Sequence, residues 1–316
     1  MKENNNITRS IKYKKEDIKL DSPQREDEEE LIEVPSHPLL KKILISIFLI
    51  IIVLIVYSCF IETSIFRVKE YKVESTSLPS EFNGLKIVHF SDIHYGTTIN
   101  KKQLDKIVTK INDLNPDIIV FTGNLIDKNI TLTENIEQEV IESLSNLKCS
   151  LYKYAIYGNE DILNNSYKDI IEKMDFKLLD NESTLLYYKG ITPILITGFN
   201  SKETNPNYTI LTNLVDEIDS ETLYKIVLSH EPDSIDSFSI YHPDLVLSGN
   251  SLGGLINIPF MKPLFLSNGS KKYYKDYYKI NNTDFYISNG LGTSGLNARF
   301  NNTPSINLYR LYMIKG

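Results

Sequence analysis

The sequence contains no tryptophan and only two cysteines, Cys59 and Cys149, in 316 residues. Two cysteines that lie far apart are too few for a disulfide framework, so we expect both thiols to be free. The chain also lacks a basic excess, because 34 Lys and Arg residues against 41 Asp and Glu residues give a formal net charge of -7. A surface that binds a phosphate backbone needs positive charge, so this balance argues against a nucleic-acid partner.

One basic segment departs from this balance. Lys271–Tyr278 combines lysine with tyrosine. Such a composition can stack on single-stranded nucleic acid, but it is also typical of an edge strand or of a loop beside a pocket. We expect the edge strand or loop, and no nucleic-acid partner.

The first 62 residues consist of a charged segment followed by an apolar segment. Residues 1–38 carry mixed charge, including the acidic run Glu26–Glu30, and have too little apolar surface to offset the entropy of ordering, which predicts a disordered tail. Residues 39–62 contain the uncharged run Ile43–Ile61, which is long enough to cross a membrane as a helix. A buried core helix or a cleaved signal peptide fits less well, because the run is apolar on every face and follows a long leader. We therefore predict a single transmembrane helix.

The charges at the two ends of this run favour one orientation. Lys41 and Lys42 precede the run and Glu62 follows it directly, although Lys and Arg are balanced over the wider flanks. Positive charge is preferentially retained on the cytoplasmic side, so we expect a single-pass protein of the cell membrane, with a cytoplasmic N-terminus and an extracytoplasmic large domain. Residues 63–84 are expected to form a linker and a lead-in strand.

From residue 85 onward, short apolar runs alternate with amphipathic stretches. Leu85–Phe90 predicts a buried strand, and Lys101–Leu114 predicts a helix with one apolar face. Glu134–Leu147 and Tyr167–Met174 predict further helices, while the second half of the chain is richer in strands. The predicted fold class is α/β, with two packed mixed β-sheets flanked by helices in one domain over residues 85–316.

Polar side chains collect directly after five of the predicted strands. The five segments are SDIHYG (91–96), GNLID (123–127), GNED (158–161), SHEPD (229–233) and SGNSLGG (248–254). Loops at the carboxyl ends of strands converge on one edge of an α/β sheet, where active sites usually lie. The sequence therefore predicts an active-site edge built from these loops.

In order and spacing, the five loops resemble the motifs of the calcineurin-like metallophosphoesterases, in particular the membrane-associated bacterial branch. That family carries Asp-x-His, Gly-Asp-x-x-Asp, Gly-Asn-His-Asp/Glu, an isolated His and Gly-His-x-His-Gly-Gly. The resemblance implies a metallo-dependent phosphatase-like four-layer sandwich over residues 85–316. It also implies a site for two divalent metals, such as Mn, Fe or Zn, bridged by a carboxylate and by a hydroxide that attacks phosphorus.

Four family ligands are present in this sequence. Carried over position by position, Asp92 and His94 would bind the first metal, and Asn159 and His230 would bind the second.

The other motif positions have changed. The bridging carboxylate falls on Asn124, the histidine that protonates the leaving group falls on Glu160, and the two histidines of the last motif fall on Asn250 and Leu252. A neutral amide supplies no charge to two cations, Asn is a weaker ligand than imidazole, and Leu cannot ligate. The resemblance therefore implies a metal site that is weakened or lost.

Two further carboxylates, Asp127 and Asp161, lie in the same motifs and are expected to stand behind the ligands. Burial or the nearby Asp161 could raise the pKa of Glu160 and so make Glu160 a general acid. His89 is expected to be a structural histidine of the first strand. Arg299 resembles a family position near the substrate, with a surface ion pair as the alternative.

Three functions remain open. The first is a membrane-anchored pseudoenzyme that binds a phosphorylated ligand or a protein partner. The second is an atypical hydrolase that uses one metal with Asp92, His94 and His230 and acts on a phosphoester or pyrophosphate near the membrane. The third is a structural or assembly protein at the membrane.

Overall fold

The computed structural model describes residues 38–201 and 223–315. The chain separates into two compact units, residues 1–47 and residues 48–316, and every contact reported below lies within the second unit.

The apolar run forms one continuous helix. α1 (Pro38–Val56) is followed by a π-helical turn, Tyr57–Ile61. Among the described residues, this is the one helix long and apolar enough to cross a membrane. None of the α1 side chains is buried, which does not fit a helix of a soluble core. The predicted charged tail lies outside the described residues, apart from Pro38, the first residue of α1.

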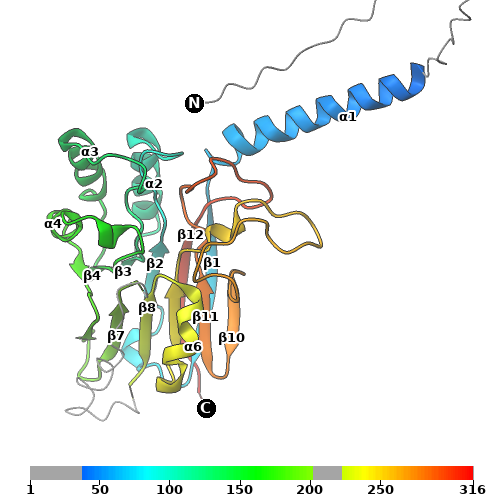
Figure 1. The fold of residues 1–316 in the computed structure, drawn as a ribbon. Helices are drawn as coiled ribbons and strands as arrows, with labels where there is room; N and C mark the ends of the chain where they lie inside the picture. The colour runs from blue at the N-terminus through cyan, green and yellow to red at the C-terminus, as the bar shows by residue number, and fades with distance from the viewer. Residues whose placement is uncertain (1–37, 202–222, 316) are drawn as a thin grey trace, which may run out of the picture. The chain divides into compact units, whose positions relative to one another are not determined.

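The globular region is built on two six-stranded sheets (Figure 1). The first sheet has the spatial order β1 (Arg67–Ser75), β12 (Ser305–Met313), β2 (Lys86–Phe90), β3 (Ile118–Phe121), β4 (Tyr152–Ala155) and β5 (Lys177–Leu178). The second sheet has the order β10 (Tyr277–Ile280), β11 (Thr283–Ile287), β9 (Leu245–Ser248), β8 (Lys225–Ser229), β7 (Ile194–Phe199) and β6 (Glu182–Leu186).

Both sheets are mixed, and the strands that precede the five polar loops run parallel within each sheet. In the first sheet β2, β3, β4 and β5 are parallel, and in the second β7, β8, β9 and β11 are parallel. The antiparallel pairs are β12 with β2, β10 with β11, and β6 with β7. The predicted α/β class with two packed mixed sheets is confirmed.

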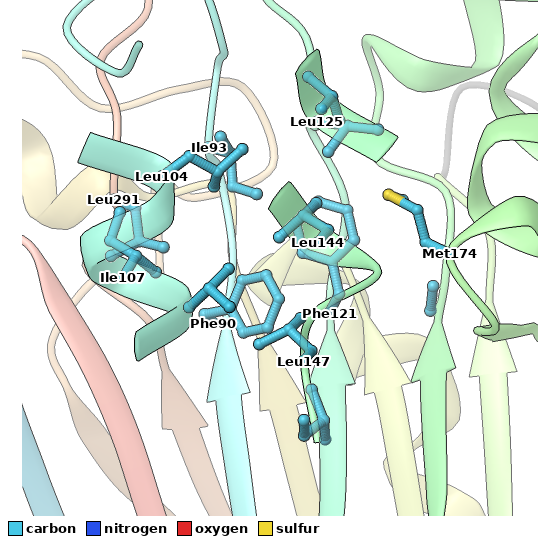
Figure 2. Close-up of a cluster of buried hydrophobic side chains, with 14 of the residues drawn as sticks. Phe90, Ile93, Leu104, Ile107, Phe121, Leu125, Leu144, Leu147, Met174 and Leu291 are labelled. Atoms are coloured by element: carbon cyan, nitrogen blue, oxygen red, sulfur yellow. The ribbon is translucent and has the colours of Figure 1, made fainter. Parts of the chain in front are cut away.

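Three helices cover the outer face of the first sheet: α2 (Lys101–Asp113), α3 (Glu134–Leu144) and α4 (Tyr167–Lys173). Figure 2 shows Phe90 and Phe121 of neighbouring strands on the same face of the sheet as Leu104 and Ile107 of α2 and Leu144 of α3. The two phenyl rings stack with centroids 5.2 Å apart. The short helix α6 (Ile235–Phe238) covers the second sheet in the same way.

Helix α2 shows how local sequence sets these elements. Its buried side chains recur at helical spacing and form one apolar face: Leu104, Ile107, Val108 and Ile111. Asn100 caps its first turn, because the Asn100 side chain accepts from the Gln103 amide at 3.1 Å and the Gln103 side chain accepts from the Asn100 amide at 3.0 Å. The helix therefore begins where the loop after β2 ends, and it anchors that loop.

Two segments are informative at the edges of the sheets. The strand predicted within residues 63–84 is β1, which pairs in parallel with β12 from Arg67–Ser305 to Ser75–Met313 and forms an edge of the first sheet. Lys271–Tyr278 is a loop whose last two residues begin the edge strand β10.

The helix predicted at Glu134–Leu147 ends earlier, at Leu144, since the amides of Asn146 and Leu147 donate to carbonyls three residues before them.

Candidate active site

The five polar loops meet at the carboxyl ends of β2, β3, β4, β8 and β9. Several motif residues have left-handed backbone angles, which non-glycine residues seldom adopt. Asp92, His94, Asn124, Asn250 and Leu252 have φ between 42° and 61°. Such strain persists only where the surrounding structure enforces it, and it clusters at functional sites. Leu252 has no polar side chain to favour this conformation and none that could ligate a metal.

Asp92 lies at the centre of the group and is fully buried. Its Oδ1 lies 3.6 Å from His94 Nε2 and 3.8 Å from His230 Nε2, and its Oδ2 accepts from the Asn250 amide at 2.9 Å. Burial alone would raise the pKa of Asp92, but the contacts with His94 and His230 outweigh it and lower the pKa. Asp92 is therefore a carboxylate surrounded by donors.

Asn124 connects this carboxylate to the third loop. Its Nδ2 donates to Asp92 Oδ1 at 3.2 Å and to Asn159 Oδ1 at 3.0 Å, while its Oδ1 accepts from the Glu160 amide at 3.1 Å. The orientation of the amide follows from these partners, because the reverse orientation would point its NH2 group at the N–H of Glu160. The bridging position of the family thus presents hydrogen-bond donors toward the site, and these residues do not fit a bridged pair of cations.

His94 contacts carboxylates on both sides. Its Nδ1 lies 3.2 Å from Glu160 Oε2 and 3.4 Å from Asp127 Oδ2, and neither His94 Nδ1 nor Asp127 Oδ2 has a hydrogen bond of acceptable geometry among the described residues. Burial would lower the pKa of His94, but Asp127, Asp92 and Glu160 outweigh it and hold the pKa well above its usual value. The three buried atoms of His94, Asp127 and Glu160 lie close enough together to hold one cation.

Glu160 does not have the environment of a general acid. It accepts hydrogen bonds from the Lys128 amide at 3.0 Å and from Ser294 Oγ at 3.1 Å. Burial favours the protonated form, but His94 and the Lys128 amide outweigh it and lower the pKa of Glu160. The carboxylate is therefore ionised at neutral pH, and the expectation that burial or Asp161 raises its pKa is wrong.

Asp161 instead holds two loops together. Its carboxylate accepts from the backbone amides of Asn124, Leu125 and Gly158, at 2.6, 2.9 and 2.8 Å. Burial raises the pKa of Asp161 to about 6 despite these hydrogen bonds.

His230 and Asn159 lie beside Asp92 and Asn124. Nδ1 of His230 donates to the carbonyl of Thr122 at 2.5 Å, which fixes the ring, and Nε2 lies 3.1 Å from Asn159 Oδ1. The four ligand types that the resemblance carried over, Asp92, His94, Asn159 and His230, are thus brought together.

The residues of the last motif contact neighbouring loops. Asn250 Nδ2 donates to the Asn268 carbonyl at 2.7 Å and to Ser270 Oγ at 3.0 Å, so this amide ties two loops to each other. Leu252 is buried, and its carbonyl accepts from Asn302 Nδ2 at 2.6 Å. Position 252 therefore contributes packing to the interior of the domain.

The structure also tests the expectations for His89 and Arg299. His89 is a buried structural residue, with Nε2 2.8 Å from Thr122 Oγ1, and burial lowers its pKa to about 3. A surface ion pair for Arg299 is wrong, because the side chain is fully buried and donates to backbone carbonyls, including those of Asn289 at 2.9 Å and Gly292 at 2.6 Å. Burial lowers the pKa of Arg299 to about 10.

A cavity of about 310 Å³ opens at the residues of the polar loops. It is lined by the motif residues His94, Asn124, Asn159, Glu160, Asn250 and Leu252 together with Lys128, Ser267, Asn268, Ser294 and Gly295. The last five were not identified from the sequence. Lys128 directly follows a motif and could have been included, whereas Ser267, Asn268 and Ser294 reach the cavity only through the tertiary fold.

Comparison with known proteins identifies the same family as the pattern of the five loops. The family model described as calcineurin-like phosphoesterase matches residues 85–287. The uncharacterized metallophosphoesterase YkuE of Bacillus subtilis (strain 168) is 32% identical over 260 residues, covering 81% of this chain and 88% of that protein. A transmembrane protein with metallophosphoesterase domain from Danio rerio is 27% identical over 249 residues, covering 74% of this chain and 54% of its own length. A solved structure, a dimetal phosphatase from Danio rerio, matches with a TM-score of 0.42 and 9% identity over 66% of this chain and 88% of its own.

Proposed function

Because the chain belongs to the calcineurin-like phosphoesterase family, we propose that it is a membrane-anchored member in which a hydrogen-bonded network replaces the two-metal centre. In this proposal the domain is a pseudoenzyme, and its cavity binds a phosphorylated ligand or a protein partner without hydrolysing it.

The orientation of the Asn124 amide is the observation that supports this most strongly. Its N–H groups point at Asp92 Oδ1 and Asn159 Oδ1, two of the atoms that would ligate metals in the family. A bridging cation would have to turn the amide over and leave the buried Glu160 N–H without its acceptor, which costs about 1–3 kcal/mol. The reversed amide would still supply no negative charge between two dications.

The rebuilt last motif supports the same proposal independently. Asn250 uses its amide on Asn268 and Ser270, and Leu252 packs inside the domain. Restoring two imidazole ligands would therefore require new side chains at both positions as well as a new bridge.

The cavity nevertheless suits a bound ligand. Its volume of about 310 Å³ is at the lower end of the range for small-molecule sites. Lys128 and Ser294 bring an ammonium and a hydroxyl group to its wall. Both groups already contact the Glu160 carboxylate, at 3.4 Å from Lys128 Nζ and 3.1 Å from Ser294 Oγ, so an anionic ligand would bind by competing with Glu160 for them.

The proposed location is the cell membrane. The support is the single apolar helix ending at Ile61 and the description of a Danio rerio relative as a transmembrane protein. We propose one span, with a cytoplasmic N-terminus and an extracytoplasmic domain, on the basis of Lys41 and Lys42 before the apolar run and Glu62 after it.

Hydrolysis assays on the full-length protein in detergent test the proposal. We expect no turnover of generic phosphomonoesters or phosphodiesters above background with Mn²⁺, Fe²⁺ or Zn²⁺ supplied. The control restores the family residues together as Asn124→Asp, Glu160→His, Asn250→His and Leu252→His. Metal-dependent turnover by the unmodified protein that Asp92→Ala abolishes would contradict the pseudoenzyme proposal.

A second candidate is a hydrolase that holds one divalent cation. It is supported by His94 Nδ1, Asp127 Oδ2 and Glu160 Oε2, which face one another and of which the first two have no hydrogen-bond partner among the described residues. A cation bound there would polarise a phosphoryl oxygen. The residues differ from the trio Asp92, His94 and His230 expected from the sequence.

Calorimetric titration with Mn²⁺ distinguishes the two candidates. The one-cation hydrolase requires saturable binding that Asp127→Asn weakens and that Asp113→Asn, at an exposed carboxylate of α2, leaves unchanged. Absence of saturable binding would exclude this second candidate.

A further inference from the structure

The loop between β9 and β10 has a composition unlike the rest of the chain. Residues 256–275 contain four lysines and no aspartate or glutamate, although the whole chain has a formal charge of -7. The first half of this segment, residues 256–266, is mainly apolar. We call residues 256–266 the apolar loop.

The side chains of the apolar loop are exposed. Five apolar residues within eight positions are partly or fully accessible to solvent: Ile258, Phe260, Met261, Leu264 and Phe265. Phe260 is fully exposed. Single exposed apolar residues are ordinary, but a cluster beside basic residues marks an interaction surface.

The apolar loop is held in place by the site. At its start, the Asn257 amide donates to the Phe300 carbonyl at 2.9 Å, and Gly254 approaches Pro263 so closely that any Cβ would clash. Just after its end, Asn268 and Ser270 accept from Asn250. The loop thus leaves the rim of the cavity and returns to it, and it projects from the sheets as the golden loop at the right of Figure 1.

The segment 299–302, which pairs with the base of the apolar loop, also binds the end of the apolar helix. Phe300 forms an isolated β-bridge with Ile256 of the loop, and the residues on both sides of Phe300 contact the end of the helix. The Arg299 amide donates to the Ser58 carbonyl at 2.9 Å, and the amides of Asn301 and Asn302 donate to the buried Glu62 carboxylate at 2.9 and 2.7 Å. Glu62 directly follows Ile61, the last residue of the candidate span. The surface next to the loop base is therefore the one from which the span leaves the domain.

A basic hollow is lined in part by the apolar loop. It has a volume of about 490 Å³, and Arg67, Lys275 and Met261 are among its lining residues. The one carboxylate in its wall, Asp276, is paired with Lys69 at 2.6 Å. Arg67 and Lys275 therefore leave the hollow with positive charge, which favours anionic groups.

We propose that the apolar loop inserts into the surface of the membrane that the span crosses, with Arg67, Lys262 and Lys275 contacting anionic lipid headgroups. Apolar side chains flanked by lysines are the usual composition of segments that lie at a lipid interface. The rim of the cavity at Ser267 and Asn268 then lies beside the headgroups. This inference rests on the membrane anchorage proposed above, but not on the loss of hydrolysis.

The absence of tryptophan provides a direct test. Phe260→Trp and Phe265→Trp each place one fluorophore in the apolar loop, and Ile191→Trp places one at an exposed site in the turn between β6 and β7 as the matched control. The full-length variants are reconstituted into vesicles of phosphatidylcholine and phosphatidylglycerol, with and without brominated acyl chains. Because brominated lipid is present in both leaflets, tryptophan quenching does not depend on which way the protein is inserted into the vesicle.

We expect brominated lipid to remove most of the emission of the two loop tryptophans and to leave Ile191→Trp unquenched. Replacing phosphatidylglycerol by phosphatidylcholine should reduce the quenching, and equal quenching in both would overturn the role of the basic residues. Loop tryptophans that brominated lipid does not quench would overturn the insertion. If their emission is blue-shifted but unquenched, the loop contacts another protein chain and the insertion is overturned as well.

An alkaline carbonate wash, applied after fluorescence is recorded, tests the anchorage separately. Protein stripped from the vesicles contradicts the span, whereas retained protein with unquenched loop tryptophans contradicts only the loop insertion.

Discussion

Asn124 Nδ2 lies 3.2 Å from Asp92 Oδ1 and donates a hydrogen bond to it, at the position where the family has a carboxylate bridging two metals. A donor in that position satisfies the Asp92 charge that a cation would otherwise satisfy. We propose that the domain folds around this buried carboxylate without metal, and this proposed exchange of a cation for an amide is the basis of the predictions that follow.

The first prediction concerns Asn124→Asp. This variant places a second carboxylate against Asp92 and removes the hydrogen bonds to Asp92 and Asn159. We expect it to unfold at a lower temperature than the unmodified protein in EDTA, because two buried like charges repel, and to recover with Mn²⁺. Thermal unfolding with and without Mn²⁺ measures both effects, and Asn165→Asp, at an exposed site, is the control. A variant as stable in EDTA as the control would show that Asn124 does not replace a cation.

The second prediction concerns acid stability. Burial lowers the pKa of His89 to about 3, so the folded state keeps this ring neutral where the unfolded chain, with a pKa near 6.5, takes up a proton. His89 therefore reduces stability as the pH falls from about 6.5 toward 3, by about 1.4 kcal/mol per pH unit. Urea unfolding between pH 4 and 6.5 should show a shallower slope for His89→Gln than for the unmodified protein.

His242→Gln is the matched control for that slope, because His242 is exposed. An unchanged slope in His89→Gln would mean that the buried imidazole is not the group that titrates.

The third prediction concerns Gly249 in the fifth motif. A Cβ at this position would lie 2.0 Å from Ser91 Oγ and 2.8 Å from Asp92 Oδ2. Gly249→Ala should therefore displace the Asp92 loop and destabilise the fold by more than Gly295→Ala. At Gly295 there is open space, and only a left-handed φ of 73° opposes the substitution, at about 1 kcal/mol. Comparable unfolding temperatures for the two variants would contradict the close approach of these loops.

Local sequence predicted the elements whose causes are local. The apolar spacing of α2 and its Asn100 cap fix a helix, and short, mainly apolar runs fix β2 and β3. The order of the five loops was enough to indicate the family and to bring Asp92, His94 and His230 into one site.

What the sequence did not predict depends on partners far away in the chain. The buried Arg299 donates to the carbonyl of Leu252, 47 residues earlier, as well as to those of Asn289 and Gly292. The direction of the Asn124 amide is set by the N–H of Glu160, 36 residues later. Glu62, read only as a flanking charge, is buried against the amides of Asn301 and Asn302.

The most direct test of the central claim is the metal content of the full-length protein after purification in detergent and dialysis against metal-free buffer. We expect well below one tightly bound transition metal per chain for the unmodified protein, and a marked gain for the combined variant Asn124→Asp, Glu160→His, Asn250→His and Leu252→His. Two metals per unmodified chain, lost in Asp92→Ala, would contradict the replacement of the metal centre by hydrogen bonds.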